Sequence, residues 1–262
     1  MNRPFLFILF ALFFLEFSYS QVVNIESRRL KTDSVFVFLG NLSLSFNDNN
    51  GSQVFQFGSG LTSQLKPKGS KNIYLLLGDY ALIRANGVDF NNSWFLHFRF
   101  RHKFSDLIRF ESYVQSQHDG LLDVNYRNLI GAGLRLKLVG VEPDDNSEEQ
   151  STFKLYLGNA YMYEEEKSDA FNKRFSNHRH SSYLALTYNA GNGKVSILNV
   201  LYYQPLYSNF NDFRLLEQLK IEIPISETLD FTTTFNYYID SITPKDRKQY
   251  SSKVYFGFNI EL

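Results

Sequence analysis

The sequence predicts an all-β protein, specifically a transmembrane antiparallel up-and-down β-barrel of about twelve strands. Three observations predict this fold: an export-type apolar segment at the N-terminus, period-two alternation of apolar and polar residues from residue 35 almost to the end, and the length of the alternating segments. Most segments have roughly 10 to 13 residues, whereas strands of soluble domains average about 5 to 6 and tilted membrane-spanning strands need about 9 to 11.

Composition narrows the function classes. The chain has 262 residues, with 27 Lys+Arg, 27 Asp+Glu and no Cys. A neutral balance counts against a nucleic-acid partner, because phosphate contacts require an excess of basic residues. The lack of cysteine excludes a disulfide scaffold, a thiolate zinc site and a cysteine nucleophile. An aromatic content of 17% is too high for a disordered chain.

The first twenty residues have the features of a cleaved Sec signal peptide. Residues 5–15 are an unbroken apolar run after a short positive start, and Ser18 and Ser20 occupy the −3 and −1 positions of a cleavage site. A run of about 11 residues is too short to cross a bilayer of about 30 Å as a helix. We therefore expect residues 1–20 to be removed, residues 21–34 to form an N-terminal lead-in, and residues 35–262 to form the barrel.

Twelve strands are expected in order along the chain. Their approximate spans are 35–46, 53–65, 72–84, 93–104, 107–118, 126–138, 152–163, 181–189, 194–205, 213–223, 228–240 and 250–262. In 126–138, for example, Ile130 and Leu134 alternate with Arg127 and Arg135. An apolar face toward lipid and a polar face toward a lumen are typical of membrane barrels. A soluble sandwich also alternates, but its core of about 10 Å thickness would not accommodate so many Phe and Leu side chains.

The connections follow from the strand count. An even number of strands returns both termini to the periplasm, which makes 85–92 and 164–180 outer loops. The acidic segment 139–151 is long for a periplasmic turn, so the strand count near it is open.

The last predicted strand resembles a recognition signal for barrel assembly. Val254, Phe256, Phe258, Ile260 and Leu262 alternate with polar residues up to the last position. This pattern resembles the β-signal of outer-membrane barrels, although the signal prefers a terminal Phe or Trp in place of Leu262. The resemblance implies the barrel-assembly machinery as a partner, besides outer-membrane lipids and lipopolysaccharide, and leaves the oligomeric state open.

A ladder of basic residues lies on the polar faces of three consecutive segments. Its members are His97, Arg99, Arg101, Lys103, Arg109, Arg127, Arg135 and Lys137. Basic residues grouped on one wall of a pore would favour anions. Alternatively they fill a narrow lumen as structural ion pairs, with Glu111, Asp79, Glu222 and Asp240 as counter-charges.

His180 and Ser182 share one face of the eighth segment. Outer-membrane phospholipase A is similar here, with His and Ser two residues apart on a strand and an Asn on the next. A histidine base could activate the serine if Asn189 or Asn199 oriented the histidine. The simpler alternative is a polar loop that enters a strand.

Metal and cofactor sites are not predicted. His178 and His180 with Glu164, Glu165 and Glu166, or the acidic group Asp144, Asp145, Glu148 and Glu149, could bind a divalent ion. Neither group has an ordered ligand spacing. Gly131 and Gly133 lie inside a predicted strand and indicate close packing rather than a nucleotide loop.

Residues 75–138 resemble a known family. They contain Leu76-Leu77-Gly78-Asp79-Tyr80, Asn91-Asn92-Ser93-Trp94-Phe95-Leu96-His97-Phe98-Arg99-Phe100, Phe110-Glu111-Ser112-Tyr113-Val114-Gln115 and Gly131-Ala132-Gly133-Leu134-Arg135. These runs resemble the salt-induced outer-membrane proteins, a Gram-negative family whose domain has no assigned function. The resemblance implies an outer-membrane β-barrel and no catalytic residues.

We therefore expect an exported, non-enzymatic barrel of the Gram-negative outer membrane, either a narrow passive pore or an envelope-structural protein. Two alternatives remain open at this point. One is an outer-membrane lipid hydrolase that uses Ser182 and His180, and the other is a soluble secreted all-β binding module.

Overall fold

The structure is a computed structural model, and it describes residues 34–49, 51–120, 124–141, 151–168, 172–190, 194–226, 229–242 and 250–260. The expected signal peptide and all of the lead-in except Ser34 lie outside the described residues, as do residues 142–150.

The described residues form one antiparallel sheet of twelve strands in sequence order. The strands are β1 (Phe36–Asn49), β2 (Ser52–Leu65), β3 (Asn72–Ala85), β4 (Val88–Lys103), β5 (Ile108–Asp119), β6 (Val124–Val141), β7 (Thr152–Ser168), β8 (Lys173–Asn189), β9 (Ser196–Leu206), β10 (Asn209–Pro224), β11 (Leu229–Asp240) and β12 (Tyr250–Ile260). The predicted all-β, up-and-down topology of twelve strands is confirmed. β6 pairs directly with β7, so the strand count holds across the long acidic segment. No helix in the described ranges is long and apolar enough to cross a membrane.

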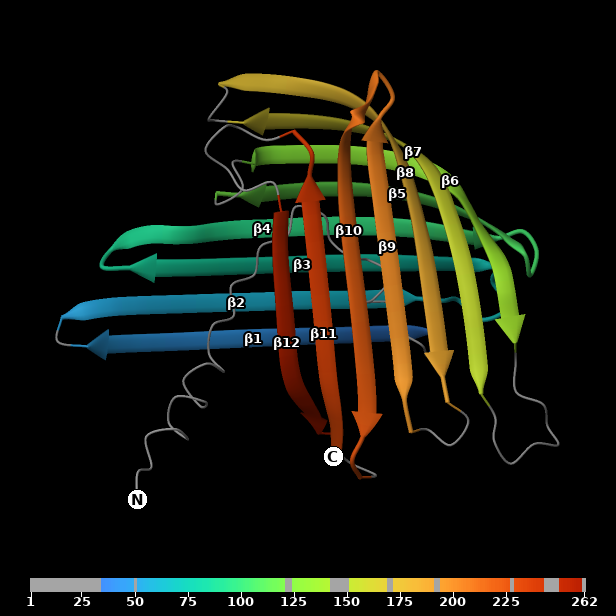
Figure 1. Cartoon of the computed structure of the whole chain (residues 1–262), viewed down its shortest axis with the longest axis horizontal. Helices are drawn as coiled ribbons and strands as arrows, with labels where there is room; N and C mark the ends of the chain where they lie inside the picture. The colour runs from blue at the N-terminus through green and yellow to red at the C-terminus, as the bar shows by residue number, and fades with distance from the viewer. Residues whose placement is uncertain are drawn as a thin grey trace.

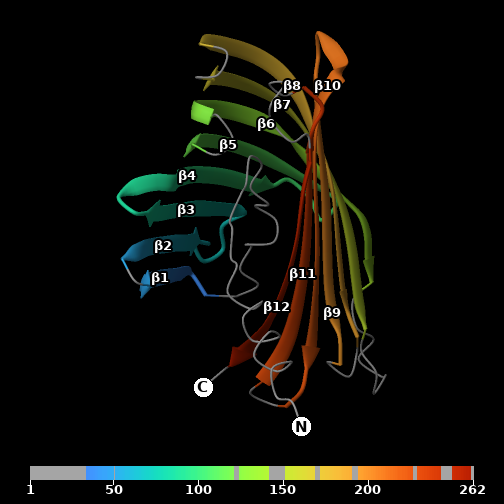
Figure 2. The same ribbon diagram turned by 60° about the vertical axis from the view of Figure 1, so that its left-hand side comes forward.

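The sheet is strongly curled but not closed. β1–β4 cross β9–β12 at a steep angle, and β5–β8 form the bend between them (Figures 1 and 2). Within the described residues β1 pairs with β2 and β12 with β11, and no pairing joins β1 to β12. The expected closed cylinder is therefore open along this seam, and β1 exposes apolar side chains on both faces, such as Leu39 and Leu42.

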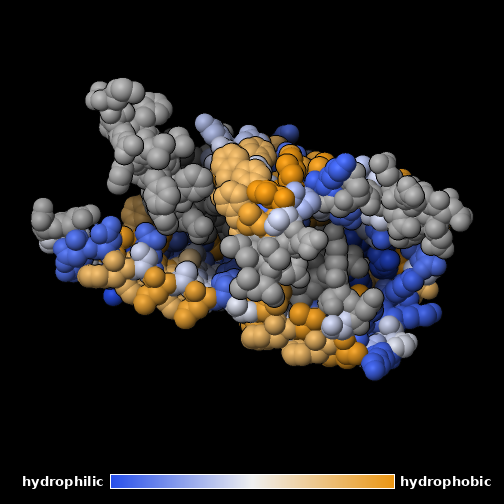
Figure 3. Space-filling view, turned by 90° about the horizontal axis from the view of Figure 1, so that it is seen from below, coloured by the Kyte–Doolittle hydropathy of each residue, from blue (hydrophilic) through white to orange (hydrophobic). Residues whose placement is uncertain are grey.

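The convex face of the sheet is apolar and exposed. On β4, Trp94, Leu96 and Phe98 are exposed, and on β12 so are Phe256 and Phe258. Hydrophobic residues form contiguous patches on the face seen in Figure 3. The predicted alternation thus holds in space, with apolar residues pointing outward on both early and late strands.

The concave face is not uniformly polar. Leu75, Leu77 and Phe95 form one buried cluster on β3 and β4. A second buried cluster consists of Tyr156, Tyr183, Ala185, Val200, Tyr202 and Leu216. The expectation of a wholly polar lumen is therefore wrong at these positions, where side chains close part of the interior against water.

Two predicted outer loops are shorter than expected. β7 and β8 continue as a paired hairpin to Ser168 and Lys173, so 164–180 is mostly strand. The apolar alternation fades there because both faces carry polar side chains. β4 begins at Val88, directly after Asn86 and Gly87, whose φ angles of 49° and 79° suit a tight hairpin turn.

Candidate functional site

The first group of candidate residues surrounds Glu111 on the concave face. Arg101 Nε donates to Glu111 Oε1 at 2.7 Å, and the Tyr183 hydroxyl donates to Oε2 at 2.7 Å. Arg99 and Arg135 approach the same carboxylate at 3.6 and 3.8 Å. We call these five residues the Glu111 cluster. It ties together β4, β5, β6 and β8, and all its members are buried.

Glycines allow the aromatic members of this site to lie flat on the sheet. A Cβ at Gly158 would collide with the Tyr183 ring, and one at Gly131 would collide with the Tyr113 ring. Each glycine is the register partner of its tyrosine on the next strand. The predicted close packing at Gly131 is confirmed, and an aromatic ring over a strand glycine is a known stabilising pair.

The second group surrounds Glu164 near the β7–β8 hairpin. Glu164 accepts from Arg179 Nε at 2.8 Å and from Arg214 NH1 at 2.9 Å, and Arg127 Nε lies 3.8 Å from it. Arg127 and Arg214 also bind Glu166, at 2.7 and 2.9 Å. A further contact joins Arg214 Nε to Asp240 Oδ2 at 3.1 Å. We call Arg127, Glu164, Glu166, Arg179, Arg214 and Asp240 the Glu164 cluster.

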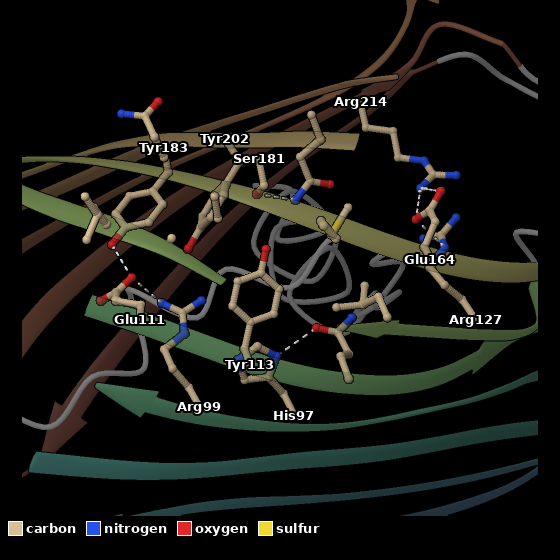
Figure 4. A pocket seen from close by; sticks show the side chains of 18 residues that line it. His97, Arg99, Glu111, Tyr113, Arg127, Glu164, Ser181, Tyr183, Tyr202 and Arg214 are labelled. Carbon is tan, nitrogen blue, oxygen red and sulfur yellow. Dashed lines mark hydrogen bonds and ion pairs between the residues drawn. The ribbon is translucent and has the colours of Figure 1, made fainter. Parts of the chain in front are cut away.

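An open cavity lies between the two clusters. Figure 4 shows the Glu111 and Glu164 clusters at opposite ends and the Tyr113 ring between them. The walls of the cavity also include Tyr202, Gln115 and Gln204. The site is therefore a polar and aromatic chamber bounded by two groups of arginines.

The eight predicted basic residues all lie on the concave face, as their strand register requires. His97, Arg99, Arg101, Arg127 and Arg135 are buried, while Lys103, Arg109 and Lys137 are less buried. They do not form one continuous wall, because Arg127 belongs to the Glu164 cluster. Among the expected counter-charges, Glu111 pairs with arginines of the basic ladder. Asp240 instead pairs with Arg214, and Glu222 pairs with Lys220.

Lys103 marks the end of the basic ladder. It forms an ion pair with Asp106 in the β4–β5 turn. The hydrogen bond and the positive charge of Lys103 lower the pKa of the Asp106 carboxyl below its usual value. This end of the ladder is therefore an ordinary surface pair rather than part of the chamber.

The sequence reasoning named Glu164 and Glu166 only as candidate metal ligands in a loop, and not as partners of arginines. It placed Arg179 in the same loop and did not single out Arg214. A usable signal was present, since Glu164 and Glu166 continue the i, i+2 series of the inward Met162.

His180 and Ser182 point to the convex side, because Arg179, Ser181 and Tyr183 between and beside them are buried. His180 Nε2 lies 2.6 Å from Ser182 Oγ. The expected amide partners are wrong. Asn189 contacts Thr152 and Ser196, and Asn199 contacts Glu217. Instead, His180 Nδ1 lies 3.2 Å from the Tyr207 hydroxyl, and Ser182 Oγ lies 2.9 Å from Asn159 Oδ1.

The candidate metal ligands do not converge. Glu164 and Glu166 lie on the concave side of the sheet, where they contact Arg214, whereas His178 and His180 lie on the other side. Within the described part of the chain, no three His, Asp or Glu side chains are placed to hold a metal ion. Asp144, Asp145, Glu148 and Glu149 lie outside the described residues.

Among curated proteins, no sequence relative is found. The solved structures that match this chain include the following two. One is a NanC porin in a rhombohedral crystal form, at 12% identity and a TM-score of 0.45, over 87% of this chain and 100% of that one. The other is the translocator domain of the autotransporter NalP from Neisseria meningitidis, at 13% identity and a TM-score of 0.34, over 87% of each chain.

The profile of a family described as "Protein of unknown function, DUF481" matches residues 44–261. The match includes residues 75–138 and confirms their resemblance to a family without an assigned function. Because it spans most of the sequence, the chain belongs to the DUF481 family.

Proposed function

We propose that this protein is an outer-membrane β-barrel that forms a narrow passive pore with a preference for anions. The observation that carries the proposal is the distribution of side chains across the sheet. Phe98 and Phe256 are exposed on the convex face, while Arg99, Arg127 and Glu164 are buried on the concave face. This is the reverse of a soluble domain and the normal arrangement of a membrane barrel. This distribution of side chains counts against the alternative that the protein is a soluble secreted binding module.

The proposal requires that β1 and β12 pair in the membrane. Each unsatisfied backbone N–H or C=O in hydrocarbon costs several kcal/mol, so open sheet edges do not persist there. Both strands are long enough to pair, with 14 and 11 residues. Their outward apolar residues, such as Phe38 and Phe258, would then continue the lipid-facing band across the seam.

The anion preference follows from the arginines that line the chamber. Arg99, Arg127 and Arg214 line it from β4, β6 and β10, and charged groups in a narrow, low-dielectric passage act strongly on passing ions. Because much of the inner face is filled by ion pairs and aromatic rings, we expect a low conductance. If the folded protein conducts no ions, the alternative is a structural role in the cell envelope.

Planar-bilayer recording of the purified protein tests the pore. In a KCl gradient we expect small single-channel currents and a reversal potential that is shifted toward the equilibrium potential of chloride. Arg99→Gln should shift the reversal potential toward the equilibrium potential of potassium, because it removes one positive charge from the chamber. Arg84→Gln is the matched control, since Arg84 is an exposed residue of the β3–β4 hairpin paired with Asp89. Protein that migrates as a folded barrel on unheated SDS gels but gives no events would contradict the pore.

A second candidate function is lipid hydrolysis at the convex face, and the short contact between His180 and Ser182 favours it. Tyr161 and Tyr207 stack beside this pair, and aromatic belts mark the membrane interface, where lipid ester groups lie. Ser182 would attack the ester carbon and pass its proton to His180. That proton would then leave with the alcohol, and water would release the fatty acid.

Phospholipid turnover by protein in mixed micelles decides this candidate. If it is right, Ser182→Ala abolishes fatty-acid release. The matched control is Ser116→Ala, because Ser116 also contacts an asparagine, Asn128, at 2.6 Å on an exposed surface but has no such histidine contact. Equal fatty-acid release from wild type and Ser182→Ala would end the idea.

A further inference from the structure

We propose that Tyr113 is the constriction of the pore, the side chain that stands in the passage and sets the size of the largest solute that crosses. This inference rests on the proposed function and adds to it, because the arginines account for a preference in charge and Tyr113 accounts for a limit in size.

Tyr113 lies in the middle of β5, and its ring stands in the cavity between the Glu111 cluster and the Glu164 cluster (Figure 4). Glu111 is near the start of β5, whereas Glu164 is near the end of β7. Since β5 and β7 both pair antiparallel with β6, they run in the same direction, and a line from one cluster to the other follows the strands. A solute that moves along the strands through the cavity therefore meets the Tyr113 ring.

Contacts from two other strands hold the Tyr113 ring in place. The His97 ring on β4 stacks against it, with 5.7 Å between the ring centres and 21° between the planes. The Arg99 guanidinium, also on β4, lies 5.4 Å from the ring centre. At the far end of the ring the hydroxyl groups of Tyr113 and Ser181 are hydrogen-bonded to each other, which connects the ring to β8. Stacking, a cation–π contact and a hydrogen bond each stabilise this orientation, so the ring is a fixed obstruction rather than a moving gate.

The glycine beneath the ring provides a way to move it. Gly131 on β6 is the register partner of Tyr113, and a Cβ atom at this position would collide with the outer end of the tyrosine side chain. The three atoms nearest to that Cβ all belong to Tyr113. An added methyl group would therefore displace the ring, which can turn about its side-chain torsions, without striking the backbone. Since the ring rests against the wall formed by β6, this displacement moves it further into the cavity.

Single-channel conductance in planar bilayers tests the constriction. Tyr113→Ala removes the ring and should raise the conductance about twofold or more, because the width of a passage limits its conductance. Tyr113→Phe keeps the ring and should conduct as wild type does, whereas Gly131→Ala should lower the conductance. Tyr161→Ala is the matched control, since Tyr161 is exposed on the convex face, and it should leave the conductance unchanged.

A double variant shows whether the change at Gly131 acts through the tyrosine. In Tyr113→Ala/Gly131→Ala the added methyl group has no ring to displace, so the conductance should equal that of Tyr113→Ala. A decrease that persists in the double variant contradicts the proposal, and so does a conductance of Tyr113→Ala equal to that of wild type. Unheated SDS gels check that each variant folds. If Tyr113→Ala does not fold, Gly131→Ala decides alone, and only a lower conductance supports the proposal.

Liposome swelling with neutral sugars tests the size limit separately from charge. In wild type the pentose arabinose should enter much faster than the trisaccharide raffinose. Tyr113→Ala should raise the rate of raffinose entry relative to that of arabinose, and an unchanged ratio of the two rates overturns the size limit.

The constriction and the pore fail separately. Wild-type channels whose conductance is the same in Tyr113→Ala keep the pore and remove the constriction. Channels that appear only in Tyr113→Ala keep the obstruction and remove the passive pore of the wild type. Folded protein without channels in any variant removes both.

Discussion

Replacement of Glu164 by alanine is expected to lower the free energy of unfolding by about 3–5 kcal/mol, the usual cost of removing one partner from a buried ion network. Glu164 is 0% exposed, and its carboxylate receives hydrogen bonds from Arg179 and Arg214. Its loss leaves buried guanidinium groups with fewer acceptors. Urea unfolding in lipid vesicles measures the effect, and the single tryptophan, Trp94, provides the signal.

The neighbouring residue is the control for this prediction. Glu165 lies on the opposite face of β7, is exposed, and accepts one hydrogen bond from the Tyr163 hydroxyl. Glu165→Ala removes the same charge and nearly the same atoms, yet we expect a change within about 0.5 kcal/mol, as for other surface substitutions. If the two variants were equally stable, the Glu164 cluster would have no structural role.

The strand pattern could be predicted from the sequence because it depends on local chemistry. Alternation in 126–138 already separates Ile130 and Leu134 from Arg127 and Arg135, and the structure places the two sets on opposite faces. The same reasoning placed the basic ladder on one face. Period-two geometry fixes which side of a strand a residue takes, whatever the curvature of the sheet.

The Glu164 cluster could not be predicted, because it depends on how far the sheet curls. Glu164 and Arg214 are 50 residues apart and on strands that are not neighbours, so only the bend brings them together. The Tyr183–Glu111 bond is similar, with 72 residues between its partners. Local pattern gives the face of each side chain, but its partner across a concave face is a property of the whole sheet.

The β7–β8 hairpin shows how a polar environment hides a strand. Beyond Tyr163 both faces carry polar groups, so the apolar signal disappears although pairing continues to Ser168. Inward Glu164 and Glu166 are held by arginines, while outward Glu165 stays exposed. If the hairpin stands above the membrane, as the proposed function implies, neither face there needs apolar residues.

Introduction of a charge into the outward apolar band is expected to have the second large effect. Phe98 lies near the middle of β4, exposed on the convex face between its register partners Leu76 and Val114. In lipid, Phe98→Arg places a guanidinium among acyl chains, which costs about 2–4 kcal/mol near the bilayer midplane. The cost appears as a lower urea midpoint in vesicles and as less folded barrel during assembly.

Position along the strand supplies the control and the decisive comparison. Val88 is the first residue of β4, exposed and next to the Asn86–Gly87 turn, so Val88→Arg lies where a membrane barrel meets headgroups or water. The same charge should cost only about 0–1 kcal/mol there. In a soluble fold both sites would face water, and both arginines would then be tolerated. A large loss at Phe98 with little change at Val88 therefore requires lipid around the convex face, and equal tolerance at the two positions would exclude it.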